Sequence, residues 1–200
     1  MSYLLHLQKD KKLHPVLYKE FPALKCRKNI PLRLMAGIMS QQLSTKVADV
    51  IYKRFLNLFD GQEPTAGQVL SISKETYRSI GLSNAKASYI HNVALFCIEN
   101  DVHDKKLKTM DNEAIITLLT QIKGVGKWTV EMLLMFSLGR EDVFPVDDLG
   151  IQNAIAKLYK LDKTDRRKLK EKMIKIAGKW KPYCTYACLH LWKMPDNAPQ

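Results

Sequence analysis

The feature that most constrains the fold is the spacing of apolar residues, which follows the helical period along almost the whole chain. One long example is the series Met35, Ile38, Met39, Leu43, Val47, Val50, Ile51, Phe55 and Leu58. Residues spaced three to four apart share one face of an α-helix. Alternating runs of β-branched residues between hairpin turns, which would indicate a sheet, are missing. The sequence therefore predicts an all-α fold.

Helix start signals recur at short intervals, so the connecting loops should be short. The candidate N-caps are Ser44, Thr65, Ser73, Ser83, Asp111 and Thr164. Each carries a side-chain oxygen that can accept a backbone N–H of the first helical turn. A cap at Ser44 would divide the long apolar series into two helices. Gln41, Gln42 and Leu43 would then lie on a tight corner between them.

The charge balance favours a polyanionic partner. Lys and Arg number 32 against 20 Asp and Glu, a net charge of 32 − 20 = +12. Nucleic acid fits such a charge, and so does an anionic membrane surface. Residues 160–181 alone carry ten basic and three acidic groups, an excess of +7. That segment is either a solvated face or a DNA contact.

The 200 residues, 46% of them hydrophobic, can bury one core, so we expect a single domain over residues 1–200. No apolar run is long enough to cross a membrane, and we expect an intracellular protein without membrane association. The four cysteines form neither a disulfide framework nor a standard zinc spacing. We expect no metal site and no cofactor.

The segment from residue 118 to 139 contains two glycines between apolar helices. Gly124 and Gly126 allow conformations and close approaches that side chains would prevent. The N–H groups of the helix that follows would form a phosphate site, with Lys123 and Lys127 adding charge. Thr129 can help to satisfy the first turn. The alternative is an ordinary corner between two packed helices.

A loop containing a proline follows, and it ends in two adjacent acidic residues, Asp147 and Asp148, before another apolar helix. A carboxylate at a helix start is often only a cap. It can also be a catalytic group. The residues alone do not decide between capping and catalysis, nor which of the two aspartates would be catalytic.

Four segments together carry a family resemblance: IMSQQLSTKVA, IKGVGKWT, FPVDDLGI and WKPYCTYACLHLW. They resemble the helix-hairpin-helix DNA glycosylase superfamily, specifically its 3-methyladenine DNA glycosylase II branch, over about residues 30–192. The resemblance implies a monomer with two helical lobes around a cleft. Residues of about 30–120 would form one lobe, and 1–29 with 130–200 the other. The hairpin would occupy about 118–139.

The resemblance also implies an activity, a partner and a catalytic residue. The substrate would be double-stranded DNA that contains damaged bases, and the reaction would be hydrolysis of an N-glycosidic bond after base flipping. The acidic residue that matches the family motif is Asp148. An ionised carboxylate would stabilise the positive charge that develops on deoxyribose. A cationic alkylated purine leaves as a neutral base and needs no general acid.

Aromatic faces hold a cationic base well, and the resemblance places Trp128 and Trp192 in the base pocket. Met132 lies one turn after Trp128, and the resemblance places it where a pocket aromatic can stand. Core packing is the alternative for all three. The corner at Gln41, Gln42 and Leu43 resembles the family's duplex plug, with Gln42 the best candidate to fill the space of the flipped nucleotide. A buried glutamine that binds a helix end is the alternative there.

Two alternatives to a monofunctional glycosylase can be weighed from the same residues. Bifunctional members use a lysine of the hairpin's second helix as a nucleophile, and Trp128 occupies that position here. Lys127 would project about 100° around the helix from it. A bifunctional or mismatch-directed glycosylase therefore fits less well. A non-catalytic hairpin module that only binds DNA backbone is the remaining alternative.

Overall fold

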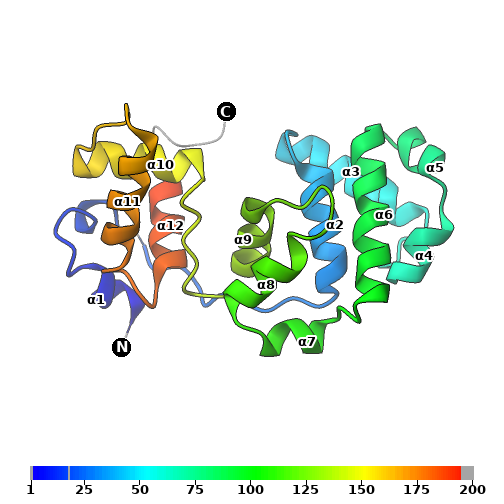
Figure 1. Ribbon diagram of the computed structural model, residues 1–200, viewed down its shortest axis with the longest axis horizontal. Coiled ribbons are helices and arrows are strands. Elements are labelled where there is room, and N and C mark those ends of the chain that lie inside the picture. The colour runs from blue at the N-terminus through cyan, green and yellow to red at the C-terminus, as the bar shows by residue number, and fades with distance from the viewer. Residues whose placement is uncertain (1, 18, 195–200) are drawn as a thin grey trace. The chain divides into compact units, whose positions relative to one another are not determined.

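The computed structural model describes residues 2–17 and 19–194, and within them it holds twelve α-helices, one 3-10 helix and no strand. The prediction of an all-α fold is confirmed for this part of the chain (Figure 1). The chain divides into two compact units. Unit 1 combines residues 1–24 with 139–200, and unit 2 comprises residues 25–138.

Unit 2 contains eight helices in chain order. They are α2 (Ile30–Ser40), α3 (Thr45–Asn57), α4 (Ala66–Ser71), α5 (Lys74–Ser79), α6 (Asn84–Glu99), α7 (Asp104–Thr109), α8 (Asn112–Leu119) and α9 (Lys127–Phe136). Helix α2 packs against α6 and also against α9. Its side chains at Leu32, Leu34, Met35, Ile38 and Met39 are almost fully buried. Helix α2 is therefore the central helix of this unit.

Side chains from other helices bind both ends of α2. At its N-terminus the Asp104 carboxylate accepts the backbone N–H groups of Asn29, at 2.8 Å, and Ile30, at 2.7 Å. At its C-terminus the Lys86 ammonium donates to the carbonyls of Met39, at 3.0 Å, and Gln41, at 2.7 Å. A negative group at the N-terminus and a positive group at the C-terminus both match the helix dipole. Burial lowers the pKa of Lys86 from its ordinary value.

Unit 1 contains α1 (Tyr3–Leu7), a 3-10 helix (His14–Val16), α10 (Leu149–Tyr159), α11 (Arg166–Ala177) and α12 (Cys184–Trp192). Helix α10 packs against α12 and α11. Trp180 is fully buried, in keeping with its expected packing role, and its indole N–H donates to Asp10 at 3.2 Å. The N-terminal segment therefore belongs to the core of the same unit as the last three helices.

The predicted caps at Ser44, Thr65, Ser73, Ser83 and Asp111 are confirmed, because each side chain accepts a backbone N–H of its helix. The cap predicted at Thr164 is wrong. Asp165 caps α11 instead and accepts the N–H of Lys168 at 3.0 Å, while the Thr164 hydroxyl donates to Asp162. The two residues are adjacent and both can cap, so the spacing alone could not separate them.

The boundary between the units lies after Leu138, whereas the sequence placed residues from about 130 onward in the other lobe. Helix α9 belongs to unit 2 because it packs against α2 and α8. The ends of that expected lobe, residue 1 and residues 195–200, lie outside the described residues. Among the described helices, none has the length and apolarity needed to cross a membrane.

Gly124 in the hairpin has no room for a side chain. Its φ is +102°, and an added Cβ would lie 2.2 Å from Cγ of Tyr89 on α6. The Asn92 side chain, also on α6, donates to the carbonyl of Lys123 at 3.1 Å. The hairpin backbone is therefore held directly against α6.

We expect Gly124→Ala to lower the free energy of unfolding by about 1–3 kcal/mol, because both the positive φ and the Tyr89 contact oppose a methyl group. Denaturant unfolding measures the change. Gly67→Ala is the matched control, since a Cβ at Gly67 meets nothing within 4 Å. Equal stability of the two variants would contradict the conclusion that position 124 has no room for a side chain.

Candidate functional site

Asp148 is the N-cap of α10, and its position is fixed by two donors. Its Oδ1 accepts the backbone N–H of Ile151 at 2.8 Å and the indole N–H of Trp192 at 2.9 Å. The residue is half-buried. The capping alternative is therefore real for Asp148, and the same carboxylate is also held by an aromatic side chain of α12.

Hydrogen bonds from α12 and from α10 hold the loop before Asp148 in place. The Thr185 hydroxyl donates to the carbonyl of Arg140 at 2.7 Å and accepts the N–H of Val143 at 3.1 Å. The side chain of Gln152 donates to the carbonyl of Val146 at 2.8 Å. These bonds connect the loop to α12 and α10, so the carboxylate is presented by an ordered backbone.

Gly150 was not singled out from the sequence, yet it leaves room for this arrangement. An added Cβ would lie 3.2 Å from Oδ1 of Asp148 and 3.2 Å from Cδ1 of Trp192. Such distances are tighter than nine in ten real Cβ contacts, so a side chain here would push its neighbours aside. A glycine inside the first turn of a helix lowers helix stability relative to alanine, and that was the signal available in the sequence.

The neighbouring Asp147 has a different environment. It is exposed, and its carboxylate forms an ion pair with Lys170 of α11. Lys170 belongs to the basic segment 160–181, in which Lys168 and Arg167 also form ion pairs with Asp165 and Glu171. Of the two aspartates that the sequence left open, only Asp148 is held by an aromatic donor in these contacts.

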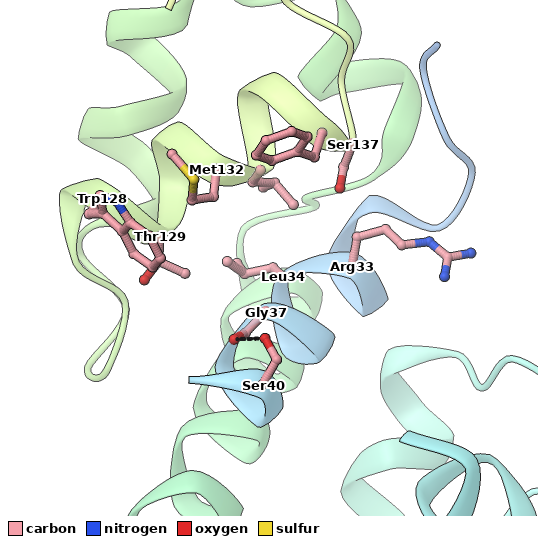
Figure 2. A pocket seen from close by; sticks show the side chains of 10 residues that line it. Arg33, Leu34, Gly37, Ser40, Trp128, Thr129, Met132 and Ser137 are labelled. Carbon is pink, nitrogen blue, oxygen red and sulfur yellow. Dashed lines mark hydrogen bonds between the residues drawn. The ribbon is translucent and has the colours of Figure 1, made fainter. Parts of the chain in front are cut away.

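An apolar pocket of about 290 Å³ lies between α2 and α9 of unit 2. Two of the predicted pocket residues, Trp128 and Met132, line it together with Leu34 and Gly37 of α2 (Figure 2). Phe136 lines it as well and was missed. Trp128, Met132 and Phe136 are spaced by four residues along α9, which is the periodic signal that could have found it.

The exposure of these side chains bears on the core-packing alternative. Trp128 is 43% exposed and Phe136 is 42% exposed, so neither is an ordinary core residue. Trp192, the other predicted wall, lies in unit 1 and donates to Asp148. Its role in the base pocket stays a prediction, and the structure shows only that its indole N–H binds the Asp148 carboxylate.

The hairpin leads into α9 through Gly126, the N-cap, which supplies no side-chain hydrogen bond to the helix start. Gly126 is exposed, and an added Cβ would meet nothing within 4 Å. Lys123 and Lys127 are exposed on either side. The helix start is thus open and flanked by positive charge, as a phosphate site requires.

Lys127 and Thr129 also have partners inside unit 2. The Lys127 ammonium lies 3.8 Å from the carboxylate of Glu131, whose side chain is 4% exposed. The Thr129 hydroxyl is buried and accepts the side-chain N–H of Gln41 at 3.2 Å. This partner differs from the one that the sequence predicted for Thr129, the first turn of its own helix.

The corner between α2 and α3 divides the predicted plug residues into two kinds. Gln41 is half-buried, and its side chain is bound to Thr129. Gln42 is exposed and has a left-handed backbone with φ of +58°. Leu43 beside it is 37% exposed. Gln41 is therefore held inside the protein by a side-chain contact, whereas Gln42, for which a buried role was the alternative, presents its side chain to solvent together with Leu43.

Comparisons with known proteins agree with this architecture. Over 162 residues the chain is 38% identical to DNA-3-methyladenine glycosylase 1 of Schizosaccharomyces pombe, covering 80% of this chain and 70% of the relative. It is 32% identical to a putative DNA-3-methyladenine glycosylase, YfjP, of Bacillus subtilis, covering 80% and 57%. A solved structure of the S. pombe 3-methyladenine DNA glycosylase with abasic DNA matches with a TM-score of 0.81, 34% identity and 96% coverage of both chains.

The family model for the HhH-GPD superfamily of base excision DNA repair proteins matches residues 35–181, which include the corner at Gln42, the hairpin and Asp148. These residues are most of the chain. The protein belongs to the HhH-GPD superfamily of base excision DNA repair proteins.

Proposed function

We propose that this protein is a monofunctional DNA glycosylase that hydrolyses alkylated purines, of the 3-methyladenine type, from double-stranded DNA. The observation that carries the proposal is the Asp148 carboxylate, held by Trp192 and Ile151 at the start of α10. The relatives named as DNA-3-methyladenine glycosylases support the substrate class.

The reaction needs a fixed negative charge. As the bond between C1′ and the base nitrogen breaks, its electron pair leaves with the base and positive charge develops on the sugar. Asp148 stabilises that charge, and water then forms the new bond to C1′ and gives up a proton to the carboxylate or to solvent. Because an N-alkylated purine is already cationic, it departs neutral without a second acid.

The pocket on α9 suits such a base. The faces of Trp128 and Phe136 attract a cationic ring, and the Met132 thioether is polarisable and adapts to its shape. A cation over an aromatic face gains about 0.5–2 kcal/mol. A neutral normal base gains less, so the pocket favours the alkylated one.

DNA binding is assigned to the hairpin and the corner. The open start of α9 at Gly126, with Lys123 beside it, binds a backbone phosphate, and Gln42 with Leu43 fills the duplex where the nucleotide is flipped out. The net charge of +12 favours the association with any duplex.

The lysine content of α9 supports a glycosylase that hydrolyses the base without cutting the DNA strand. Lys127 is the only lysine in this helix, and its ammonium is paired with Glu131. A Schiff-base nucleophile must be a neutral amine that reaches the sugar. We therefore assign hydrolysis alone.

We expect Asp148→Asn to reduce base release by at least about 100-fold, because the variant loses the negative charge. The amide oxygen can still accept from Ile151 and Trp192, so folding and duplex binding should be kept. Mass analysis of bases released from methylated DNA measures the effect. Asp147→Asn is the control and should keep its activity. Undiminished release by Asp148→Asn would refute the proposed role.

We expect Trp192→Phe to lower the single-turnover rate of base release by about 10–100-fold, since a hydrogen bond to a charged group is worth about 1.5–3 kcal/mol. Affinity for duplex DNA should change little. Trp180→Phe is the matched control, because it removes an indole N–H from Asp10 instead. A loss of stability without a loss of rate would make Trp192 only a packing residue.

We expect Gly126→Ser to keep or raise stability, because serine is a better N-cap and the backbone there is extended with open space around it. Its affinity for duplex DNA should fall by about tenfold, since the hydroxyl would occupy the place of the phosphate. Thermal unfolding and fluorescence anisotropy measure the two effects. An unchanged affinity would indicate that this helix start does not contact DNA.

A further inference from the structure

The corner between α2 and α3 is a tight turn with an unusual residue in it. The backbone N–H of Leu43 donates to the carbonyl of Ser40 at 3.1 Å. Gln41 has φ of −51° and ψ of 132°, and Gln42 follows with φ of +58°. This pattern is typical of a type II turn, whose third residue needs a positive φ and is usually glycine or asparagine. Gln42 therefore has a strained backbone that the surrounding contacts must hold in place.

Gln41 anchors this turn through two separate hydrogen bonds. Its backbone carbonyl accepts from the Lys86 ammonium at 2.7 Å, which joins the turn to α6. Its side-chain amide donates to the Thr129 hydroxyl at 3.2 Å, which joins the turn to α9. Thr129 is 8% exposed, so this second bond is largely shielded from water. A substitution at position 41 keeps the carbonyl and removes only the bond to α9.

The bond between Gln41 and Thr129 connects two parts of unit 2 that have different tasks under the proposed function. Gln41 directly precedes Gln42, which is proposed to fill the duplex. Thr129 directly follows Trp128, and both line the apolar pocket (Figure 2). A flipped nucleotide leaves the place that Gln42 fills, and its base enters the pocket. The distance from the corner to the pocket therefore has to match the reach of one nucleotide.

The stability of unit 2 does not by itself require a polar pair at this place. Replacing both partners of a buried hydrogen bond by apolar groups of the same shape can be nearly neutral for stability. A hydrogen bond differs from an apolar contact in having a defined direction and length. The pair therefore restricts where the corner lies against the start of α9 more narrowly than apolar packing would.

We propose that Gln41 is a positioning residue whose bond to Thr129 holds the corner at a fixed place beside the base pocket, so that Gln42 enters the duplex correctly. In this role Gln41 contacts neither the damaged base nor the sugar. The inference rests on the proposed function for the tasks of Gln42 and of the pocket.

The first measurement follows insertion of Gln42 without any base release. The probe is a duplex with a tetrahydrofuran abasic analogue opposite 2-aminopurine, whose fluorescence changes when a side chain stacks into the gap. Wild type should bind this duplex more tightly than an undamaged one. Gln42→Ala should lose that preference and most of the fluorescence change.

Two variants remove the bond and nearly keep the size of the side chain. Gln41→Met and Thr129→Val should each lower the preference for the abasic duplex by about three- to tenfold, the effect of one neutral hydrogen bond. The double variant should lower it no further, because both substitutions remove the same bond. Thr129→Ser keeps the hydroxyl and should retain the wild-type preference. Affinity for the undamaged duplex should stay the same in all of them.

Tyr77→Phe is the matched control for a purely structural role. It removes the buried bond of 2.8 Å from the Tyr77 hydroxyl to the carbonyl of Val69, which joins α5 to α4. Thermal unfolding measures the stability that each variant loses. Tyr77→Phe should lose stability and keep the preference for the abasic duplex. The same outcome for Thr129→Val would overturn the inference.

Release of 3-methyladenine from methylated DNA separates this inference from the proposed function. Single-turnover release by Gln41→Met should fall by about the same factor as its preference for the abasic duplex. If wild type releases no base but the variants show the predicted preferences, the glycosylase activity is refuted and the positioning role is supported. Normal release by wild type, with equal release and preference in Gln41→Met, refutes the positioning role and leaves the proposed function intact.

Discussion

The arrangement of unit 2 depends on how α2 is held. This helix is apolar enough to be buried against α6 and α9, and burial leaves the polar groups at its ends in need of partners. Asp104 and Lys86 supply them, one at each end. Because Lys86 binds the last carbonyls, the chain can turn sharply at Gln41 and present Gln42 outward. The corner and the pocket wall are therefore set by the same two charged side chains.

In unit 1 one carboxylate has a structural role and, under the proposed function, a chemical one as well. The bond from Ile151 makes Asp148 a helix cap, and the bond from Trp192 orients the same oxygen. The capping and catalytic interpretations, which the sequence set against each other, are thus compatible. The N-cap position suits a reactive carboxylate, because the hydrogen bond to the helix start restricts the rotation of the side chain and the helix dipole favours its negative charge.

Local signals in the sequence predicted much of this fold. Five caps and the hairpin position follow from adjacent residues, and the structure contains them. Contacts between distant residues could not be predicted. Trp192 lies far along the chain from Asp148, and nothing in its neighbourhood indicates the bond between them. Gly37 likewise carries no signal in the sequence, since only the structure shows that an added Cβ there would meet nothing within 4 Å.

Under the proposed function, the charge changes of the reaction explain why the apolar pocket lacks acidic side chains. Within the described residues, the walls of the apolar pocket contain no Asp or Glu. A carboxylate there would stabilise the cationic base before the bond breaks and would raise the barrier, because positive charge leaves the base as it develops on the sugar. Aromatic and thioether groups attract the cation only modestly and hold the neutral product less tightly. The anionic group is instead Asp148, and under the proposed function its interaction with the sugar becomes stronger as the reaction proceeds.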